Sequence, residues 1–351
     1  MQAFMRYIGI DYSGAGTPNS SLKGLRVYLA EGEEPPLEVL PPPSAKKYWT
    51  RRGIAEWLVE RLTEGVPTLV GIDHGFSFPL RYFEVHGLLP DWPRFLDDLQ
   101  RHWPTDEDHT CVDGVRESFA GNGVKRLGNA HWRRLTEEWA GSAKSVFHFD
   151  VPGQVAKSTH AGIPWLRFIR ERLGKRVHFW PFDGWDIPAG LSAIAEVYPA
   201  LWSRDFAREG RTGDQHDAFS IAASLWRADH DGSLVRLLNP SLSASDIGIA
   251  SVEGWILGVE EGKKGKKRLR GDKNGGDRHL ARKHAQTTRL GYVNKNFQRV
   301  TRQTDQPGND HSQRVYVLNC DKCGHEYGAN GSDIWQRRCP VCQNGAKGLD
   351  Y

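Results

Sequence analysis

The sequence lacks any apolar run long enough to cross a lipid bilayer, which takes roughly 18 to 20 consecutive apolar residues. Its first residues, MQAFMRYIGI, also lack the charged start, the long apolar centre and the small-residue cleavage site of a secretory signal. We therefore expect a cytoplasmic protein with no membrane partner. With 351 residues and 38% hydrophobic content, the chain can fill one large core or two modest ones.

Cysteine is also scarce, and the five cysteines are an odd number that does not suit a secreted disulfide framework. Four of them form two Cys-x-x-Cys pairs, Cys320 with Cys323 and Cys339 with Cys342. Two tight knuckles at this spacing present four thiolates tetrahedrally to Zn²⁺. The pattern predicts a structural zinc site, because four thiolates leave no open position for a substrate. We interpret the fifth, Cys111, as a packed or surface thiol.

The net charge of +4 is small, but its distribution along the chain is uneven. A Gly-rich, strongly basic stretch follows residue 260, and its composition is typical of a linker. We expect one large domain at about 1–260, a basic linker at 261–288 and a small zinc-binding domain at 289–351.

The cysteine-containing segment resembles a zinc ribbon, a module that often binds nucleic acid, although a role in binding a protein partner is the alternative. Basic and aromatic residues near the cysteines favour nucleic acid, with DNA expected rather than RNA. The residues expected to contact it are Lys263, Lys264, Lys266, Lys267, Arg268, Arg270, Arg299, Arg302, Trp335, Arg337 and Arg338.

The large domain shows an α/β order of strands and helices. YIGID, GLRVYLA and LEVL read as strands, and SAKKYWTRRGIAEWLVERLTEG reads as an amphipathic helix that starts near its serine. TLVGID, RVHFW and AIAEVYP read as further strands, PWLRFIRERLG as a helix, and DQHDAFSIAASLWRAD as the final helix. Residues at about 75–155 show no regular period, and we interpret them as an insertion.

Five acids fall at the ends of these elements. Asp11 and Asp73 each end a strand, Glu196 lies in the last strand, and Asp214 and Asp217 open the final helix. Ligands of open α/β sheets bind at strand ends, so these acids can converge there. Carboxylates in close proximity repel one another, and hard oxygen ligands suit Mg²⁺ or Mn²⁺. The acids therefore predict a catalytic Mg or Mn site.

The set GIDYSGA, GIDHGFSFP, AEVYPALW and GDQHDAFSIAA resembles an RNase H-like domain, of the predicted-nuclease branch related to RuvC-type resolvases. The resemblance covers about residues 5–230 and implies a mixed sheet flanked by helices. It also implies a metal-dependent nuclease, an endonuclease rather than an exonuclease. Asp11, Asp73 and Asp217 resemble the family's metal ligands, Asp214 resembles an additional resolvase acid, and Glu196 is typical of the predicted-nuclease branch.

Other interpretations of these residues stay open. Asp214 can be the N-cap of its helix, and Glu196 a buried structural acid. Lys157, Ser158 and His160 offer phosphate contacts or form a solvated loop. The Asp-Gly turns also suit an actin-like or sugar-kinase-like ATP-binding protein, although that class needs two copies of the fold. A nucleic-acid-binding scaffold without catalytic activity is the third possibility.

Overall fold

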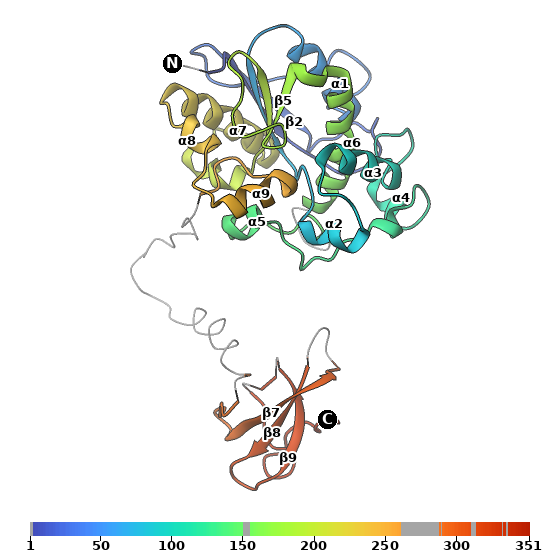
Figure 1. Cartoon of the computed structure of the whole chain (residues 1–351), viewed down its shortest axis with the longest axis vertical. Coiled ribbons are helices and arrows are strands. Elements are labelled where there is room, and N and C mark those ends of the chain that lie inside the picture. The colour runs from blue at the N-terminus through green and yellow to red at the C-terminus, as the bar shows by residue number, and fades with distance from the viewer. Residues whose placement is uncertain are drawn as a thin grey trace. The chain divides into compact units, whose positions relative to one another are not determined.

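The computed structural model describes residues 3–149, 155–260, 288, 290–309, 314–331, 333–334 and 336–351. The chain divides into two compact units, Met1–Lys267 and Arg268–Tyr351 (Figure 1). Within the described ranges, no helix combines the length and the apolar character that a membrane crossing requires. The predicted basic linker lies almost wholly outside the described residues.

The large unit is built on a six-stranded mixed sheet with the strand order β3-β2-β1-β4-β6-β5. Strands β1, β2 and β3 pair antiparallel, whereas β1, β4, β6 and β5 run parallel to one another. Their bounds are β1 Arg6–Asp11, β2 Arg26–Glu31, β3 Leu37–Glu38, β4 Thr68–Asp73, β5 Val177–Trp180 and β6 Ser192–Glu196.

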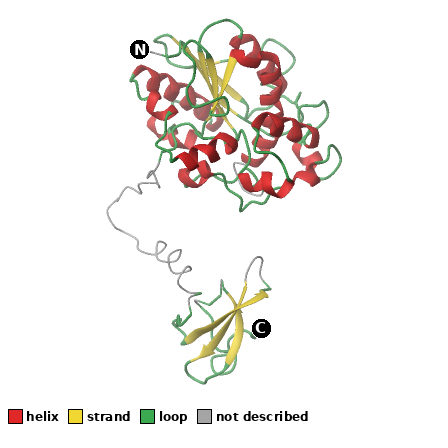
Figure 2. Ribbon diagram, in the orientation of Figure 1, coloured by secondary structure: helices red, strands yellow, loops and turns green. Residues whose placement is uncertain are grey.

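Helices cover both sides of this sheet, as Figure 2 shows in red around the yellow strands. They are α1 Arg51–Leu62, α2 Leu80–His86, α3 Trp92–His102, α4 Val112–Arg116, α5 Leu135–Ala140, α6 Val155–Leu173, α7 Gly213–His230, α8 Leu234–Leu238 and α9 Ala244–Glu253. Short 3₁₀ turns lie at Gly123–Arg126 (η1), Gly174–Arg176 (η2), Pro199–Leu201 (η3) and Ser203–Asp205 (η4). The predicted α/β class, a mixed sheet flanked by helices, is confirmed.

The register of the parallel strands decides which face of the sheet each side chain reaches. Asp11 lies opposite Asp73 in the β1–β4 pair, so their side chains point to the same face. Glu196 lies opposite Ile72 in the β4–β6 pair and therefore points to the other face. Glu196 thus leaves the sheet on the face opposite to the two strand aspartates, although all three stand at neighbouring strand ends.

Helix α7 packs closely on the face of the sheet that carries Asp11 and Asp73. Gly9 in β1 permits this approach, because a Cβ atom there would lie 2.2 Å from the carbonyl oxygen of Ala218. The close packing brings the first turn of α7 to the strand ends. The other face is covered by α1 and α6, whose Leu58 and Leu166 share a core with Ile10 of β1.

Two helices begin at places that differ from the sequence expectation. Helix α1 starts at Arg51, not near a serine, because the Thr50 hydroxyl caps it by accepting from Gly53 N. Helix α6 extends well before Pro164, which lies inside it. Pro164 has no N–H to donate to the His160 carbonyl, and that carbonyl accepts from the Thr105 hydroxyl at 2.8 Å instead.

The insertion folds against the sheet as a set of short helices, α2 to α5, with an aromatic core. The ring centre of Phe78 lies 4.7 Å from that of Tyr82, 5.1 Å from that of Phe95 and 4.6 Å from that of Phe147. Helices of five to seven residues, such as α2, α4 and α5, are too short to show a helical period. Helix α3 is longer, and the helical period of its buried Trp92, Phe95, Leu96 and Leu99 is a signal that the sequence prediction missed.

The small unit contains a three-stranded antiparallel sheet in the order β7-β8-β9. The strands span Gln298–Pro307, Arg314–Cys320 and Glu326–Asn330. Its own small core gathers Val300, Leu318, Tyr327, Ala329 and Ile334. A core of this size supports little stability by itself, which makes a bound metal an expected part of the fold.

Candidate active site and metal centre

A cleft of about 690 Å³ opens at the carboxyl ends of β1, β4 and β6. The five acids that the sequence analysis singled out all line it: Asp11, Asp73, Glu196, Asp214 and Asp217. Residues far apart in the sequence thus meet at one place, at the edge where open α/β sheets bind their ligands.

Asp11 and Asp73 form the centre of the cluster. Burial raises the pKa of Asp11 well above its usual range, and the carboxylates of Asp73, Asp214 and Asp217 raise it further. Burial likewise raises the pKa of Asp73 to about 8, with further contributions from Asp217 and Glu196. The charges of the other three aspartates thus disfavour the charged form of Asp11, and a cation would relieve that repulsion.

Asp214 and Asp217 come from the first two turns of α7. The cap of this helix is Thr212, which forms a capping box with Gln215, so Asp214 is not the N-cap. The helix start therefore leaves the Asp214 carboxylate available to the cleft. Burial and the charge of Asp214 raise the pKa of Asp217, although the His216 and Arg208 side chains oppose this shift.

Glu196 has a different environment from the aspartates. Arg134 donates to both of its oxygens, Nη2 to Oε1 at 2.6 Å and Nη1 to Oε2 at 2.7 Å. The Phe76 N–H donates to Oε2 at 3.0 Å, and the side chains of Arg134 and Glu196 are almost fully buried. These contacts are those of a structural acid, the alternative that the sequence left open, and we revise the expected ligand set accordingly.

The same arginine holds other parts of the insertion. Its Nε donates to Glu137 at 2.9 Å, and its Nη1 also donates to the backbone oxygen of Glu253 in α9. The Glu253 carboxylate accepts from Leu80 N and Leu135 N, which begin α2 and α5. Arg134 and Glu253 together fasten the insertion to the sheet.

The acids are less tightly gathered than a complete metal cage. Among the described residues, the group whose potential ligand atoms all lie within 4.8 Å of one another consists of cysteines, not of these aspartates. Mg²⁺ keeps several waters and is often held by one or two carboxylates together with substrate phosphates. The donor chemistry of the aspartates, hard oxygens in an open cleft, therefore fits Mg²⁺ or Mn²⁺.

The sequence patterns did not predict some cleft residues and placed others in a different element. Three cations line the cleft, Arg134, Lys144 and Lys157, and Lys157 pairs with Asp113 at 2.7 Å. Lys157 and Ser158 lie in the first turns of α6, not in a loop. His160 is buried, and burial lowers its pKa to about 3, so it offers no charge to a phosphate. No periodic signal in the sequence marks Arg134 or Lys144.

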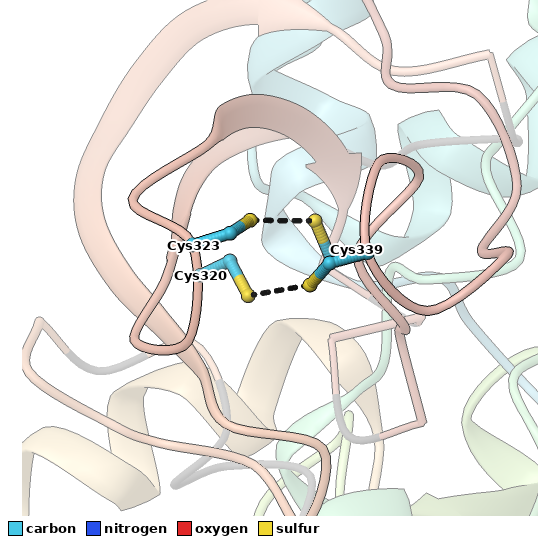
Figure 3. A group of neighbouring side chains, drawn as sticks. Cys320, Cys323 and Cys339 are labelled. Atoms are coloured by element: carbon cyan, nitrogen blue, oxygen red, sulfur yellow. Dashed lines mark hydrogen bonds between the residues drawn. The ribbon is translucent and has the colours of Figure 1, made fainter.

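The four cysteines of the small unit form a second site. Their Sγ atoms all lie within 4.8 Å of one another, with the Cys320–Cys342 and Cys323–Cys339 pairs at 3.6 Å. Four thiolates arranged tetrahedrally at 2.3 Å from a zinc ion stand about 3.8 Å apart. Figure 3 shows Cys320, Cys323 and Cys339 directed toward a common centre. The cluster could therefore hold a metal ion.

Hydrogen bonds favour the thiolate form of one of these cysteines. Burial of Cys320 opposes its charged form, but donors from Gln298 and from the backbone of Lys322 and Cys323 lower its pKa to about 6. The thiolate is the form that binds metals, so these donors prepare the site for one.

The residues expected to contact nucleic acid are placed only in part. Arg299 pairs with Asp321 through both carboxylate oxygens, at 3.0 and 2.7 Å, and Arg302 lies over the Tyr351 ring. Arg337 donates to the Ala346 carbonyl, and Arg338 is exposed. Lys263, Lys264, Lys266, Lys267, Arg268, Arg270 and Trp335 lie outside the described residues.

Comparison with known proteins finds no matching family model, no matching curated protein and no matching solved structure. The chemistry of the cleft therefore has to be inferred from its own residues.

Proposed function

We propose that the protein is a metal-dependent nuclease that hydrolyses phosphodiester bonds of nucleic acid in the aspartate-lined cleft. One observation carries the proposal. Four aspartates from β1, β4 and α7 line a single cleft, and the pKa of Asp11 is raised by burial and by the other three. A protein keeps such a costly cluster of like charges where a cation or a catalytic task needs it.

The proposed ligands are Asp11, Asp73, Asp214 and Asp217, and the proposed ion is Mg²⁺ or Mn²⁺. When bound, such ions activate a water molecule and stabilise the leaving oxygen of a phosphodiester. The protein's own contribution is to orient the ligands, with Asp11 and Asp73 fixed by the β1–β4 register and the α7 acids by its capping box. Lys144 and Lys157 on the cleft wall supply positive charge for the phosphates.

The proposal includes an RNase H-like fold for the large unit and a zinc ribbon for the small one. The mixed sheet, the strand-end positions of Asp11 and Asp73 and the two acids in α7 support the first part. The cysteine geometry supports the second. In this proposal the zinc is structural, and the ribbon, through its exposed cations, helps to hold nucleic acid, with DNA as the expected partner.

The actin-like alternative gains little support from the fold. That class of ATP-binding protein needs two copies of its domain, whereas the described part of this chain holds one six-stranded sheet and one three-stranded sheet. A scaffold without catalytic activity would not need all four aspartates, since their mutual repulsion destabilises the fold without a cation.

The experiment that tests the function is a cleavage assay on a panel of labelled substrates. Single-stranded DNA, duplex DNA, a four-way junction and matching RNA are each incubated with the protein and Mg²⁺ or Mn²⁺, with a chelated reaction as the control. ATP turnover is measured on the same sample. We expect metal-dependent cleavage of at least one nucleic acid. ATP turnover without cleavage would instead establish the alternative.

A further inference from the structure

The position of Arg51 is unusual for a charged residue. Its side chain is 0% exposed, yet no carboxylate among the described residues lies within ion-pair distance of it. It is also the first residue of α1, where the helix dipole disfavours a positive charge. Burial lowers the pKa of Arg51, and the smaller opposing effects of Tyr12 and Cys111 do not offset it. Violations of this kind tend to concentrate at functional sites.

The partners of Arg51 are three backbone carbonyls of one loop. Its Nη1 donates to the oxygens of Ser13 at 3.3 Å and Ala15 at 2.6 Å, and its Nη2 donates to the oxygen of Gly16 at 2.9 Å. Its Nε has no acceptor among the described residues. One buried cation thus organises the loop that follows Asp11 directly.

This loop forms a wall of the acid-lined cleft. Ser13, Gly14 and Ala15 line the cleft, whereas Arg51 lies behind them and does not. The carbonyls bonded to Arg51 are therefore turned away from the cleft. Because the C=O and N–H of a trans peptide point in opposite directions, the Gly14 N–H that follows the Ser13 carbonyl points away from Arg51.

The loop also contacts α6, the helix that carries Lys157 of the cleft. A Cβ atom on Gly14 would lie 2.2 Å from the backbone carbon and oxygen of Lys157, so the loop and the first turn of α6 are in direct contact. Among the described residues the Gly14 N–H has no hydrogen-bond acceptor. Gly14 is buried but lines the cleft, and its unpaired amide is a suitable donor to an oxygen of a phosphate that enters there.

We propose that Arg51 is a positioning residue. It holds the carbonyls of the loop Ser13–Gly16 so that the Gly14 N–H can donate to a phosphate oxygen of the substrate. The phosphate part of this inference rests on the proposed function; the loop part does not. A phosphodiester and the phosphates of ATP share the chemistry, and the experiment distinguishes them.

The test measures amide hydrogen exchange of the full-length protein, in the peptides that cover residues 12–20. Arg51→Met is compared with Arg61→Met, a control on the same helix whose arginine pairs with Glu64 near the surface. We expect Arg51→Met to speed exchange in residues 12–20 on the order of tenfold, with little change in the strands, and Arg61→Met to leave it unchanged. Equal exchange in wild type and Arg51→Met would overturn the proposal. If Arg51→Met does not fold, Arg51→Lys replaces it, since one ammonium cannot reach all three carbonyls.

Ligand arms use inorganic phosphate, ATP or a dinucleotide, each with Mn²⁺. We expect phosphate to slow exchange at Gly14 in wild type and not in Arg51→Met, and a dinucleotide to protect better than ATP. If phosphate does not slow exchange at Gly14 in wild type, the proposed phosphate role is overturned. If ATP protects Gly14 better than the dinucleotide does, the phosphate role belongs to the alternative ATP-binding function. Where cleavage is observed, kcat should fall by about tenfold or more in Arg51→Met and recover in part in Arg51→Lys. Protection without any cleavage would refute the nuclease and leave the role of Arg51 intact.

Discussion

Arg134 and Glu196 form a buried bidentate ion pair that joins the insertion to the last strand of the large sheet. Each partner satisfies the charge of the other, so Glu196 has little remaining capacity to bind a cation. The strand register also argues against Glu196 as a ligand, because its side chain faces the side of the sheet opposite to Asp11 and Asp73. The contacts of Glu196 are therefore those of a structural acid, whereas Asp11 and Asp73 remain proposed metal ligands.

Substitution of Glu196 distinguishes the two roles. Glu196→Gln should leave Mn²⁺ affinity close to that of wild type, whereas Asp73→Asn should weaken it strongly, as titrations of both variants with Mn²⁺ can show. An equal loss of Mn²⁺ affinity in Glu196→Gln and Asp73→Asn would return Glu196 to the ligand set.

Arg134→Met should cost about 3–5 kcal/mol of unfolding free energy, because it leaves buried carboxylates unpaired.

The raised pKa of Asp73, about 8, predicts how stability without metal depends on pH. Below the pKa of the unfolded aspartate, roughly 4, both states carry the proton; between that value and 8 the folded state binds it more tightly. Unfolding free energy should therefore fall as pH rises through this window, by up to about 1.4 kcal/mol per pH unit for one proton. Asp73→Asn removes this dependence, so the variant should exceed wild type in stability at pH 8 and lose that advantage toward pH 5. Denaturant unfolding at several pH values, with chelator present, measures the difference. Parallel pH profiles of the two proteins would contradict the prediction.

Removal of metal should unfold the small unit and spare the large one. Structural zinc contributes on the order of 10–16 kcal/mol to the folding of zinc-finger peptides, and the small unit has few core residues to replace it. Elemental analysis should find one zinc per chain in wild type and in Cys111→Ser, and none in Cys323→Ser. Chelation should broaden or shift the NMR signals of β7 to β9 while those of β1 and β4 persist. Metal-free wild type with intact signals would contradict this account.

The salt dependence of nucleic-acid binding tests the role of the C-terminal region. If cations from Lys263 to Arg302 contact phosphates, log affinity should fall against log salt with a slope of about −0.9 per contact on duplex or −0.7 on single strands. Deletion of residues 261–351 should flatten that slope while cleavage persists at low salt, because every proposed aspartate ligand precedes residue 220. Equal slopes for the full-length and truncated proteins would instead favour a protein partner for the small unit.

The sequence allowed the strands and their terminal acids to be predicted because buried parallel strands are short, continuous apolar runs. YIGID and TLVGID end at Asp11 and Asp73, as expected. The face to which each acid points could not be predicted, since it depends on register between β4 and β6. The partner of Glu196 lies 62 residues away in the insertion, and no local pattern connects the two.

Arg51 shows a second limit of sequence patterns. A basic residue at the start of an amphipathic helix is normally assigned to the solvated face, whereas here it is fully buried against the loop after Asp11. Pro164 shows a third, since a proline predicts a helix boundary unless another donor satisfies the carbonyl four residues earlier. Thr105 supplies that donor from the insertion, a contact that only the fold creates.

Asp11→Asn is the most direct test of whether the aspartate cleft uses a divalent cation to cleave nucleic acid. The change keeps the shape of the side chain and removes its charge, so the variant should be at least as stable as wild type without metal. We measure cleavage of a substrate by wild type and Asp11→Asn at equal protein and Mn²⁺ concentration. We expect Asp11→Asn to lose about 100-fold or more of the cleavage rate, because the stabilisation that such ions supply is worth several kcal/mol. Equal cleavage by the two proteins would contradict it.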